Sequence, residues 1–418
     1  MRRTTMSALA GTAALAIGTT ALAGTTTATA APTQGSESYI VVLEAGSASG
    51  HVARQHGNRY GADVSHVYRS AVRGYAARMT PAAAARVATD SRVAWVQLDG
   101  TVHATGKPGG GATAAQSTPT GINRANADAS STVAGDGTGA VNVDVAVIDS
   151  GVDLDHPDLN VYRAGAKNCS TGASADDGNG HGTHVAGTVG AKDDASGVVG
   201  MAPGARVWPV RVLNNAGSGT WSDVVCGIDY VAANADQIEV ANMSLGGTGT
   251  DSGNCGNGSD AMHAAICNAV AKGVTFVVAA GNESDDSANH VPAAYDEVIT
   301  VSALADFNGL PGGGAASTCR ADVDDTFAGF SNYGADVDLI APGVCIASTW
   351  KGGGYNTISG TSMASPHVAG GAALYLASHA GASPATVKSA LQSSGSTDWN
   401  DVDDPDSTKE RLLDVSTY

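Results

Sequence analysis

A serine stands where a run of small residues changes into an apolar, alanine-rich segment. The stretch Gly360-Thr361-Ser362-Met363-Ala364-Ser365-Pro366-His367 predicts a tight turn followed by a helix that ends near His379. A serine in the first turn of a buried helix lies near unpaired backbone N–H groups and the positive end of the helix dipole, where negative charge on an attacked carbonyl is stabilised. The same serine can equally be a helix cap. A nucleophilic serine also needs a base and an orienting acid from elsewhere in the chain.

Three more polar side chains lie at the ends of apolar runs or at the start of a helical pattern. Asp149 follows Val143–Ile148, His181 opens a helical pattern, and Asn282 follows Val274–Ala280. A buried aspartate needs a partner, and a buried amide can donate to a developing oxyanion. Each feature alone can also be a turn or a capped helix. The H-x-x-H spacing that His181 begins could bind a metal, but it lacks the adjacent glutamate of a zinc-protease helix.

A parallel sheet would bring these side chains to one edge. From about Gly139 the chain alternates apolar runs with helical patterns, which predicts right-handed βαβ units with helices on both faces. We expect strands at 143–148, 207–213, 240–245, 274–280 and 298–303, and helices near 183–190, 222–235 and 259–272. Ligands of such sheets bind beyond the carboxyl ends of the strands.

A smaller unit precedes this domain. Residues 38–103 show a β-α-β-β-α-β alternation, which is typical of a ferredoxin-like fold, and Thr80-Pro81 predicts the start of its second helix. A Gly/Ala/Thr/Pro segment from 105 to 119 has no periodic pattern and indicates an exposed linker.

Charge divides the chain in the same way. The net charge is −18, but residues 1–115 hold 10 basic and 5 acidic residues, and the remainder holds 12 basic and 35 acidic residues. An acidic main domain argues against a nucleic-acid partner. We expect the basic front unit to dock electrostatically on the acidic domain, although acidic surfaces also simply keep secreted proteins soluble.

The first 30 residues predict export. Met1-Arg2-Arg3, an apolar run from Ala8 to Leu22 and small residues at Ala28-Thr29-Ala30 indicate a signal peptide that is cleaved near Ala30, and a membrane anchor is the alternative. All six cysteines lie after residue 115, an even number that suits disulfides in an oxidising compartment. Many pairings are open, and nearness in sequence favours Cys255–Cys267, Cys319–Cys345 and Cys169–Cys226.

Three blocks together resemble one family. Asp149 in Val-Ile-Asp-Ser-Gly, His181 in Gly-His-Gly-Thr-His-Val-Ala-Gly and Ser362 in Gly-Thr-Ser-Met-Ala-Ser-Pro-His match the signatures of the subtilisin-like serine peptidases, in their chain order. The resemblance covers residues 120–395, and residues 38–103 are similar to the inhibitory propeptide of that family. The cysteines and Gly-rich insertions suggest a secreted actinobacterial type.

The resemblance implies a role for each residue. Ser362 is the nucleophile, His181 the general base, and Asp149 orients the imidazole. Asn282 and the Ser362 backbone N–H would hold the oxyanion, and Thr361 would support them with its hydroxyl. His184 and His367, on the same helices, would be structural.

The resemblance also implies how substrates bind. Ser244, Leu245, Gly246 and Gly247 match the segment along which substrates add as a β-strand. The small residues Gly246, Gly247, Ala279, Ala280 and Gly281 imply an open pocket for large uncharged side chains, with Glu283 near its rim.

Structural calcium is the implied cofactor, with no organic cofactor. Asp336 and Asp338, with the carbonyls of Ala293, Tyr295 and Val298, resemble one family site, and Asp158 with Asp194 resembles a second. The alternative is that these aspartates are solvated surface groups.

The expected fold class is α/β, with a three-layer subtilisin-like domain at 116–418 after a signal peptide at 1–30 and an α+β propeptide at 31–115. We expect an extracellular monomer that acts on proteins and peptides, is inhibited by its own propeptide, and does not stay on a membrane once the signal is removed. The propeptide would lay its exit strand in the cleft as a product-like inhibitor, and self-cleavage would fall between Ala104 and Gln116. An esterase or lipase would need G-x-S-x-G, where Ala364 replaces the second glycine. A non-catalytic scaffold would lack a triad or oxyanion residue, and none is missing.

Overall fold

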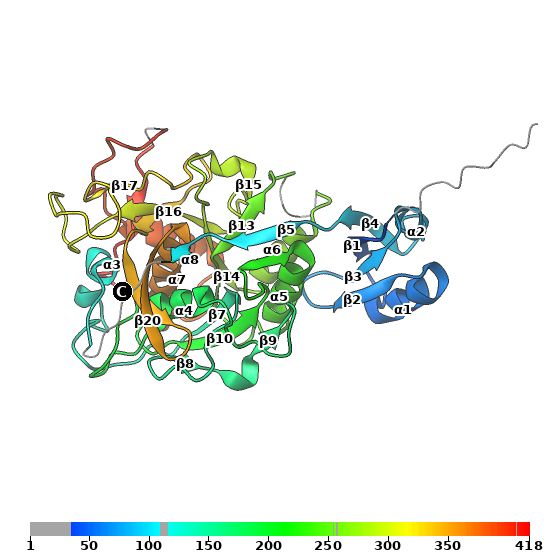
Figure 1. Ribbon diagram of the computed structural model, residues 1–418, viewed down its shortest axis with the longest axis horizontal. Coiled ribbons are helices and arrows are strands. Elements are labelled where there is room, and N and C mark those ends of the chain that lie inside the picture. Colours follow the sequence, from blue (N-terminus) through cyan, green and yellow to red (C-terminus); the bar gives the residue numbers. More distant parts are fainter. Residues whose placement is uncertain (1–34, 109–115, 254, 256–257, 407) are drawn as a thin grey trace, which may run out of the picture. The chain divides into compact units, whose positions relative to one another are not determined.

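The computed structural model describes residues 35–108, 116–253, 255, 258–406 and 408–418 (Figure 1). The predicted signal peptide and residues 109–115 of the predicted linker lie outside these ranges. A search of the described helices finds none that is both long and apolar enough to cross a membrane. Residues Ser36–Tyr418 belong to one compact unit.

The front of this unit is a four-stranded antiparallel sheet with two helices. Its elements are β1 (Glu37–Leu43), α1 (Ser49–Tyr60), β2 (Asp63–Tyr68), β3 (Gly74–Met79), α2 (Pro81–Val87) and β4 (Val93–Leu98), in the sheet order β2-β3-β1-β4. The Thr80 hydroxyl accepts a hydrogen bond from the Ala83 N–H at 3.2 Å, with Pro81 beginning α2. The predicted β-α-β-β-α-β order is therefore confirmed.

A mostly parallel sheet forms the centre of the larger domain. Its strands run in the order β21 (Arg411–Leu412), β18 (Leu339–Pro342), β16 (Ile299–Ala305), β14 (Thr275–Ala279), β12 (Val240–Met243), β7 (Asp144–Asp149), β10 (Arg206–Arg211) and β8 (Asn160–Val161). The two short strands off this path are β9 (Lys167–Asn168), parallel to β10, and β17 (Thr326–Phe327), antiparallel to β16. After β7 the chain crosses to β10 on one side and then to β12 on the other, so β7 and β12 flank the switch point where ligands bind in such sheets.

Helices cover both faces of this sheet, as the alternating side chains of β7 show. Ala146 and Ile148 pack into one cluster with α5 (Trp221–Ala233) and α6 (Ala261–Val270). Val145 and Val147 point to the other face, against α4 (His181–Gly190) and α7 (Thr361–Ser378), and α8 (Pro384–Ser394) packs on α7. The domain thus has the predicted three-layer α/β architecture (Figure 1).

Several elements were not predicted from the sequence. They include β18 and β21 of the sheet, the hairpin of β19 (Ile346–Trp350) and β20 (Gly354–Ser359), and the helices α3 (Thr120–Arg124) and α8. Strands of two to four residues are too short for a periodic pattern, and Pro342 ends β18 with a residue that is unusual within sheets. The C-terminal segment adds β21 to the sheet edge.

The chain passes from the small domain to the large one through two short strands. Strand β5 (Thr101–Ala104) pairs with β11 (Ser218–Thr220) on one side and β13 (Leu245–Thr248) on the other. Strand β6 (Lys107–Pro108) then pairs with β20. The segment that the sequence indicated as the beginning of a linker is therefore held by the larger domain.

The predicted electrostatic docking takes a different form from the one expected. The Asp229 carboxylate on α5 accepts hydrogen bonds from the backbone N–H groups of Arg69, Ser70 and Ala71 at 2.6–3.0 Å. His66 pairs with Asp223 at 2.9 Å. Among the described residues, no arginine of the small domain forms an ion pair with the large one. The acidic helix recognises main-chain donors and a histidine.

Candidate active site

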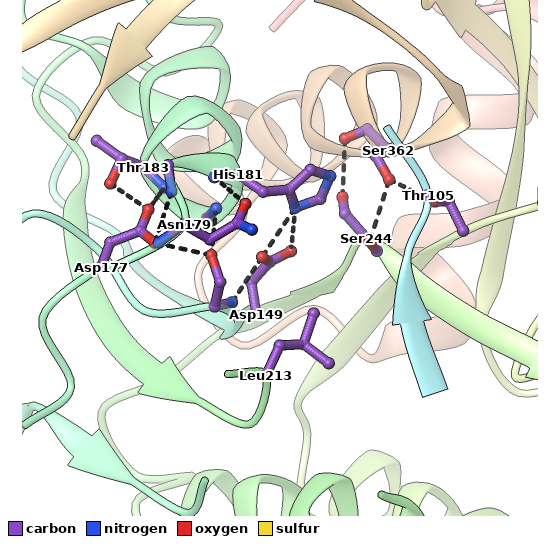
Figure 2. A network of polar contacts seen from close by, with 12 residues as sticks. Thr105, Asp149, Asp177, Asn179, His181, Thr183, Leu213, Ser244 and Ser362 are labelled. Atoms are coloured by element: carbon purple, nitrogen blue, oxygen red, sulfur yellow. Dashed lines mark hydrogen bonds and ion pairs between the residues drawn. The ribbon is translucent and has the colours of Figure 1, made fainter. Parts of the chain in front are cut away.

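The pair of Asp149 and His181 lies at the carboxyl end of β7. Asp149 ends that strand fully buried, and its two carboxylate oxygens lie 2.8 and 3.0 Å from Nδ1 of His181 (Figure 2). Burial by itself would lower the pKa of His181, but the negative charge and hydrogen bond of Asp149 outweigh it, so this pKa is raised above its usual value. The arrangement fixes one imidazole orientation and stabilises its protonated form.

A second aspartate, which the sequence analysis missed, holds the start of α4. The buried carboxylate of Asp177 accepts hydrogen bonds from the Ser150 hydroxyl at 2.9 Å and from the Thr183 N–H and hydroxyl at 2.9 and 2.6 Å. It also accepts the N–H of Gly180, whose φ of 112° favours glycine directly before His181. Asp177 thus joins the segment after β7 to the helix that carries His181 (Figure 2). In sequence it was indistinguishable from a turn aspartate.

The start of α7 explains how Ser362 is held. Pro366 has no N–H, so the Ser362 carbonyl four residues earlier has no intrahelical donor. The Ser244 hydroxyl donates to that carbonyl at 2.8 Å, and the Ser362 hydroxyl donates to the Ser244 carbonyl at 3.0 Å. This reciprocal pair ties the helix start to the end of β12, and both serines are fully buried.

Asn282 lies beside this helix start with a fixed amide orientation. Its Oδ1 accepts hydrogen bonds from the Thr361 N–H at 2.9 Å and the Thr361 hydroxyl at 3.0 Å. The Nδ2 donor therefore points away from Thr361, and it donates to the carbonyl of Thr105. Among the described residues, the Ser362 backbone N–H forms no hydrogen bond with this carbonyl.

Thr105 and Gly106 thus occupy the centre of the site, where the exit strand of the propeptide was expected, although neither residue was singled out from the sequence. The Thr105 hydroxyl contacts the Ser362 hydroxyl (Figure 2). Gly106 lies so close to His181 that a Cβ on it would be 3.1 Å from Nε2. Within the described ranges, Nε2 of His181 has no hydrogen-bond partner, so Ser362 and His181 are not joined in this structure. The structure brings the three predicted triad residues together: Asp149 is hydrogen-bonded to His181, whereas no hydrogen bond joins His181 to Ser362.

The segment that was predicted to bind substrates, Ser244–Gly247, pairs with a strand of the same chain, β5. Leu245 pairs with Ala104 and Gly246 with His103 in the antiparallel ladder of β13 and β5. Beside Thr105 lies a cavity of about 600 Å³. Its lining includes the predicted small residues Gly246, Gly247, Ala279, Ala280 and Gly281, with Asn282 and Glu283, and also Trp221 and His290, which were not predicted.

His184 and His367 lie outside this chemistry. His184 is buried against the carbonyl of Ile346 at 2.9 Å, and burial lowers its pKa to about 3. His367 contacts the Met363 carbonyl at 2.7 Å, and burial lowers its pKa to about 4. Both imidazoles are neutral near pH 7, in keeping with the structural role that the resemblance implies.

Comparison with known proteins identifies two families along the chain. Residues 141–410 match the model of the subtilase family, and residues 38–105 match that of peptidase inhibitor I9. The chain belongs to the subtilase family. It is a serine endopeptidase preceded by an inhibitor-type domain.

Named relatives cover most of this subtilase. Subtilisin DY of Bacillus licheniformis is 41% identical over 282 residues, which is 67% of this chain and 92% of that protein. The extracellular serine proteinase of Thermus sp. (strain Rt41A) is 40% identical over 340 residues, or 79% and 73% of the two chains. A crystal structure of a cold adapted subtilisin-like serine proteinase superposes with a TM-score of 0.53 at 38% identity, covering 66% of this chain and 89% of the other. The predicted family and fold are confirmed.

The first predicted calcium site of this subtilase does not fit a metal ion. The carboxylate of Asp338 and the carbonyl of Val298 both bind the ammonium group of Lys388, at 2.8 Å each. The carbonyl of Ala293 accepts the Thr300 hydroxyl at 2.7 Å, and that of Tyr295 accepts the Val298 N–H at 3.4 Å. The expectation that these groups and Asp336 surround a cation is corrected, because a protein cation already binds two of them.

The second predicted site fits a cation at one of its two carboxylates. Asp158 is buried, its Oδ2 accepts the Val198 N–H at 3.0 Å, and its Oδ1 has no partner among the described residues. Burial raises the pKa of Asp158 to about 6. Asp194 is exposed and accepts the Ser196 N–H and hydroxyl of its own turn at 2.8 and 3.1 Å. Asp158 would hold a calcium ion, which would supply the positive charge that this carboxylate lacks.

The structure forms all three of the disulfides that sequence proximity favoured: Cys169–Cys226, Cys255–Cys267 and Cys319–Cys345. Cys255 and Cys267 also lie near His263 and Glu297 in a metal-like grouping. Because both sulfurs belong to a disulfide, they are not available as thiolate ligands.

Proposed function

We propose that this subtilase is a secreted, self-processing serine endopeptidase whose catalytic residues are Asp149, His181, Ser362 and Asn282. The observation that supports this most directly is the position of Thr105. Its carbonyl accepts a hydrogen bond from Asn282 while its own side chain contacts the Ser362 hydroxyl. A carbonyl held by an oxyanion donor beside a serine is arranged as a substrate.

The proposed reaction forms an acyl-enzyme and then hydrolyses it, with His181 transferring protons in both steps. The Ser362 hydroxyl attacks the carbonyl carbon while His181 accepts its proton at Nε2, and Asp149 stabilises the resulting imidazolium. Asn282 and the Ser362 backbone N–H stabilise the oxyanion. His181 then donates the proton to the leaving amine, and an acyl-enzyme remains on Ser362. Water attacks this acyl group while His181 accepts its proton, and His181 then returns the proton to the Ser362 oxygen as the acid leaves.

The first substrate in this proposal is the chain itself, at the peptide bond between Thr105 and Gly106. Strand β5 holds the acyl side of this bond and β6 holds the amine side. The bond lies within the range from Ala104 to Gln116 in which the sequence placed cleavage, and it moves the proposed start of the peptidase domain from residue 116 to Gly106. The released small domain would remain bound as an inhibitor.

Other proteins and peptides would bind where β5 now lies. Main-chain pairing with β13 accepts almost any extended segment, so selectivity depends on the cavity beside Thr105. We propose broad specificity for proteins, with a preference for large uncharged side chains, in an extracellular monomer that binds structural calcium at Asp158. A requirement for one charged residue in a panel of peptides would contradict this preference.

The decisive experiment compares the full chain with its Ser362→Ala variant. The wild-type chain should yield a fragment that begins at Gly106, hydrolyse casein, and be labelled at Ser362 by a serine-directed phosphonylating reagent. The variant, purified alone, should remain intact and inactive. Cleavage of the purified variant at the same bond would refute self-processing, whereas an unlabelled, inactive wild-type chain would refute the proposed activity.

A further inference from the structure

The ammonium group of Lys388 on α8 contacts the turn at residues 296–298 and the nearby Asp338. Its Nζ lies 2.8 Å from the Asp338 carboxylate, 2.8 Å from the Val298 carbonyl and 3.2 Å from the Asp296 carbonyl. Three acceptors match the three N–H donors of an ammonium group. The side chains of Lys388 and Asp338 are only 24% and 13% exposed, so this is not an ordinary surface ion pair.

The acceptors around Lys388 are those that a hard cation would use. One carboxylate and two carbonyls, two residues apart in one turn, form an all-oxygen set. Both carboxylate oxygens of Asp338 also accept other hydrogen bonds. Oδ2 accepts the Thr300 N–H at 3.0 Å. Oδ1 accepts from the amide nitrogen of Gln392 at 3.2 Å, and Gln392 lies one turn after Lys388 on α8. Burial raises the pKa of Asp338, and the positive charge of Lys388 opposes that effect.

We propose that Lys388 is a tethered cation that replaces a metal ion at Asp338, so this part of the subtilase is held together without calcium. A bound metal stabilises a protein only while free metal is present. A lysine of the same chain gives its stabilisation at any metal concentration, and chelators cannot remove it.

The turn that Lys388 holds also supports the substrate cavity. The chain runs from His290 and Val291, which line the cavity, through Ala293 to the turn at 296–298. The Thr300 hydroxyl ties the Ala293 carbonyl to the strand that follows. Loss of the ammonium group should therefore loosen one wall of the cavity as well as the contact with α8.

The test is a calcium titration of thermal unfolding in the full chain carrying Ser362→Ala, which prevents autolysis. Lys388→Met keeps the length of the side chain and removes its charge. This variant should unfold at a lower temperature in a chelator, and it should gain a calcium-dependent rise of roughly 2–4 °C beyond that of the parent. Adding Asp338→Asn should abolish the extra rise. Lys167→Met is the matched control, since Lys167 makes no side-chain hydrogen bond or ion pair within the described chain, and it should behave as the parent.

Two results would overturn the proposal. One is a Lys388→Met variant that is destabilised but gains no additional response to calcium. The other is a single Asp338→Asn variant, with Lys388 present, that loses part of the parent's calcium response, because a metal would then already bind there. The second comparison holds even if Lys388→Met fails to fold. Both use an inactive chain, so they are independent of the proposed self-processing.

Discussion

Single residues in the site hold the hydrogen-bonding atoms of their neighbours in place. Thr361 donates twice to the amide oxygen of Asn282, which leaves the NH₂ group facing the Thr105 carbonyl. The Thr361 hydroxyl also accepts the Gly281 N–H at 3.1 Å. The donor is therefore oriented before negative charge develops, which is the condition for effective oxyanion stabilisation.

Replacing Asn282 by alanine should slow cleavage of the bond between Thr105 and Gly106 by ~10²–10³-fold, a general magnitude that was itself established on a subtilisin. The measurement is the single-turnover rate at which refolded precursor yields the Gly106 fragment. Asn268→Ala is a suitable control because Asn268 is exposed on α6 and, within the part of the chain that the structure describes, its amide hydrogen-bonds only to the Ala264 carbonyl. A less than tenfold effect of Asn282→Ala would contradict the role proposed for the amide.

The sequence identified some residues of the site and not others for physical reasons. Asp149, His181 and Ser362 stand in long motifs, so their types and order were informative. The exit strand was expected in the cleft, but Thr105 itself was not singled out, because its position follows from the pairing of β5 with β11 and β13, which lie far along the chain. Lys388 was missed for the same reason, since its partners are 50 to 92 residues away.

At the scale of elements, the loop 192–198 is held by the carboxylate of Asp158, one oxygen of which has no hydrogen-bond partner among the described residues. Asp158 accepts the Val198 N–H from this loop and has one free buried oxygen among the described groups. Its pKa of about 6 is above the ordinary value of 3.8. Without a cation, the stabilisation that the neutral form provides is present below pH 4 and is lost as the pH rises through 6.

Calcium should therefore raise the unfolding temperature of the Ser362→Ala chain at pH 8, and this rise should become smaller below pH 6, where Asp158 is protonated. Asp158→Asn should remove most of the rise at pH 8. The measurement is scanning calorimetry with calcium or a chelator, and Asp155→Asn, at an exposed aspartate nearby, is the control. An unchanged calcium response in Asp158→Asn would contradict the assignment.

Helix α8 could have been predicted from its sequence, although it was not. Ser383 caps it by accepting the Thr386 N–H at 3.2 Å, and Pro384 is its first residue, the same signature that correctly marked α2 at Thr80-Pro81. By contrast, β21 has only two residues and forms because the end of β18 offers a free sheet edge. Local signals predict helices with caps, whereas edge strands depend on the partner.

At the scale of the whole molecule, the uneven charge of the chain correctly predicted that the two domains dock, but it did not predict which groups make the contact. The acidic domain does bind the basic one, but through backbone N–H groups and His66 rather than arginines.

The excess of acidic residues also leaves a buried carboxylate near the C-terminal end without a positive partner in the described chain. Glu410 is buried, both of its carboxylate oxygens lack partners among the described residues, and burial with the charges of Asp404 and Asp406 raises its pKa to about 8.

Stability should fall as the pH rises from about 4.5 to 8, because in that window the folded chain keeps a proton on Glu410 that the unfolded chain releases. The expected slope from this group is about 1.4 kcal/mol for each pH unit. Glu410→Gln should flatten the profile, equal the parent near pH 4 and exceed it at pH 9. Denaturant unfolding of the Ser362→Ala chain across this range measures it, and a parallel profile for both chains would contradict the shifted pKa.

The continuity of β5 and β6 through the active centre has a kinetic consequence. The proposed scissile bond is tethered on both sides within one chain, so its encounter with Ser362 needs no collision between molecules. The first cut should follow first-order kinetics in the precursor. Dilution therefore leaves the half-time of this cut unchanged, whereas it slows every later cut in another protein in proportion.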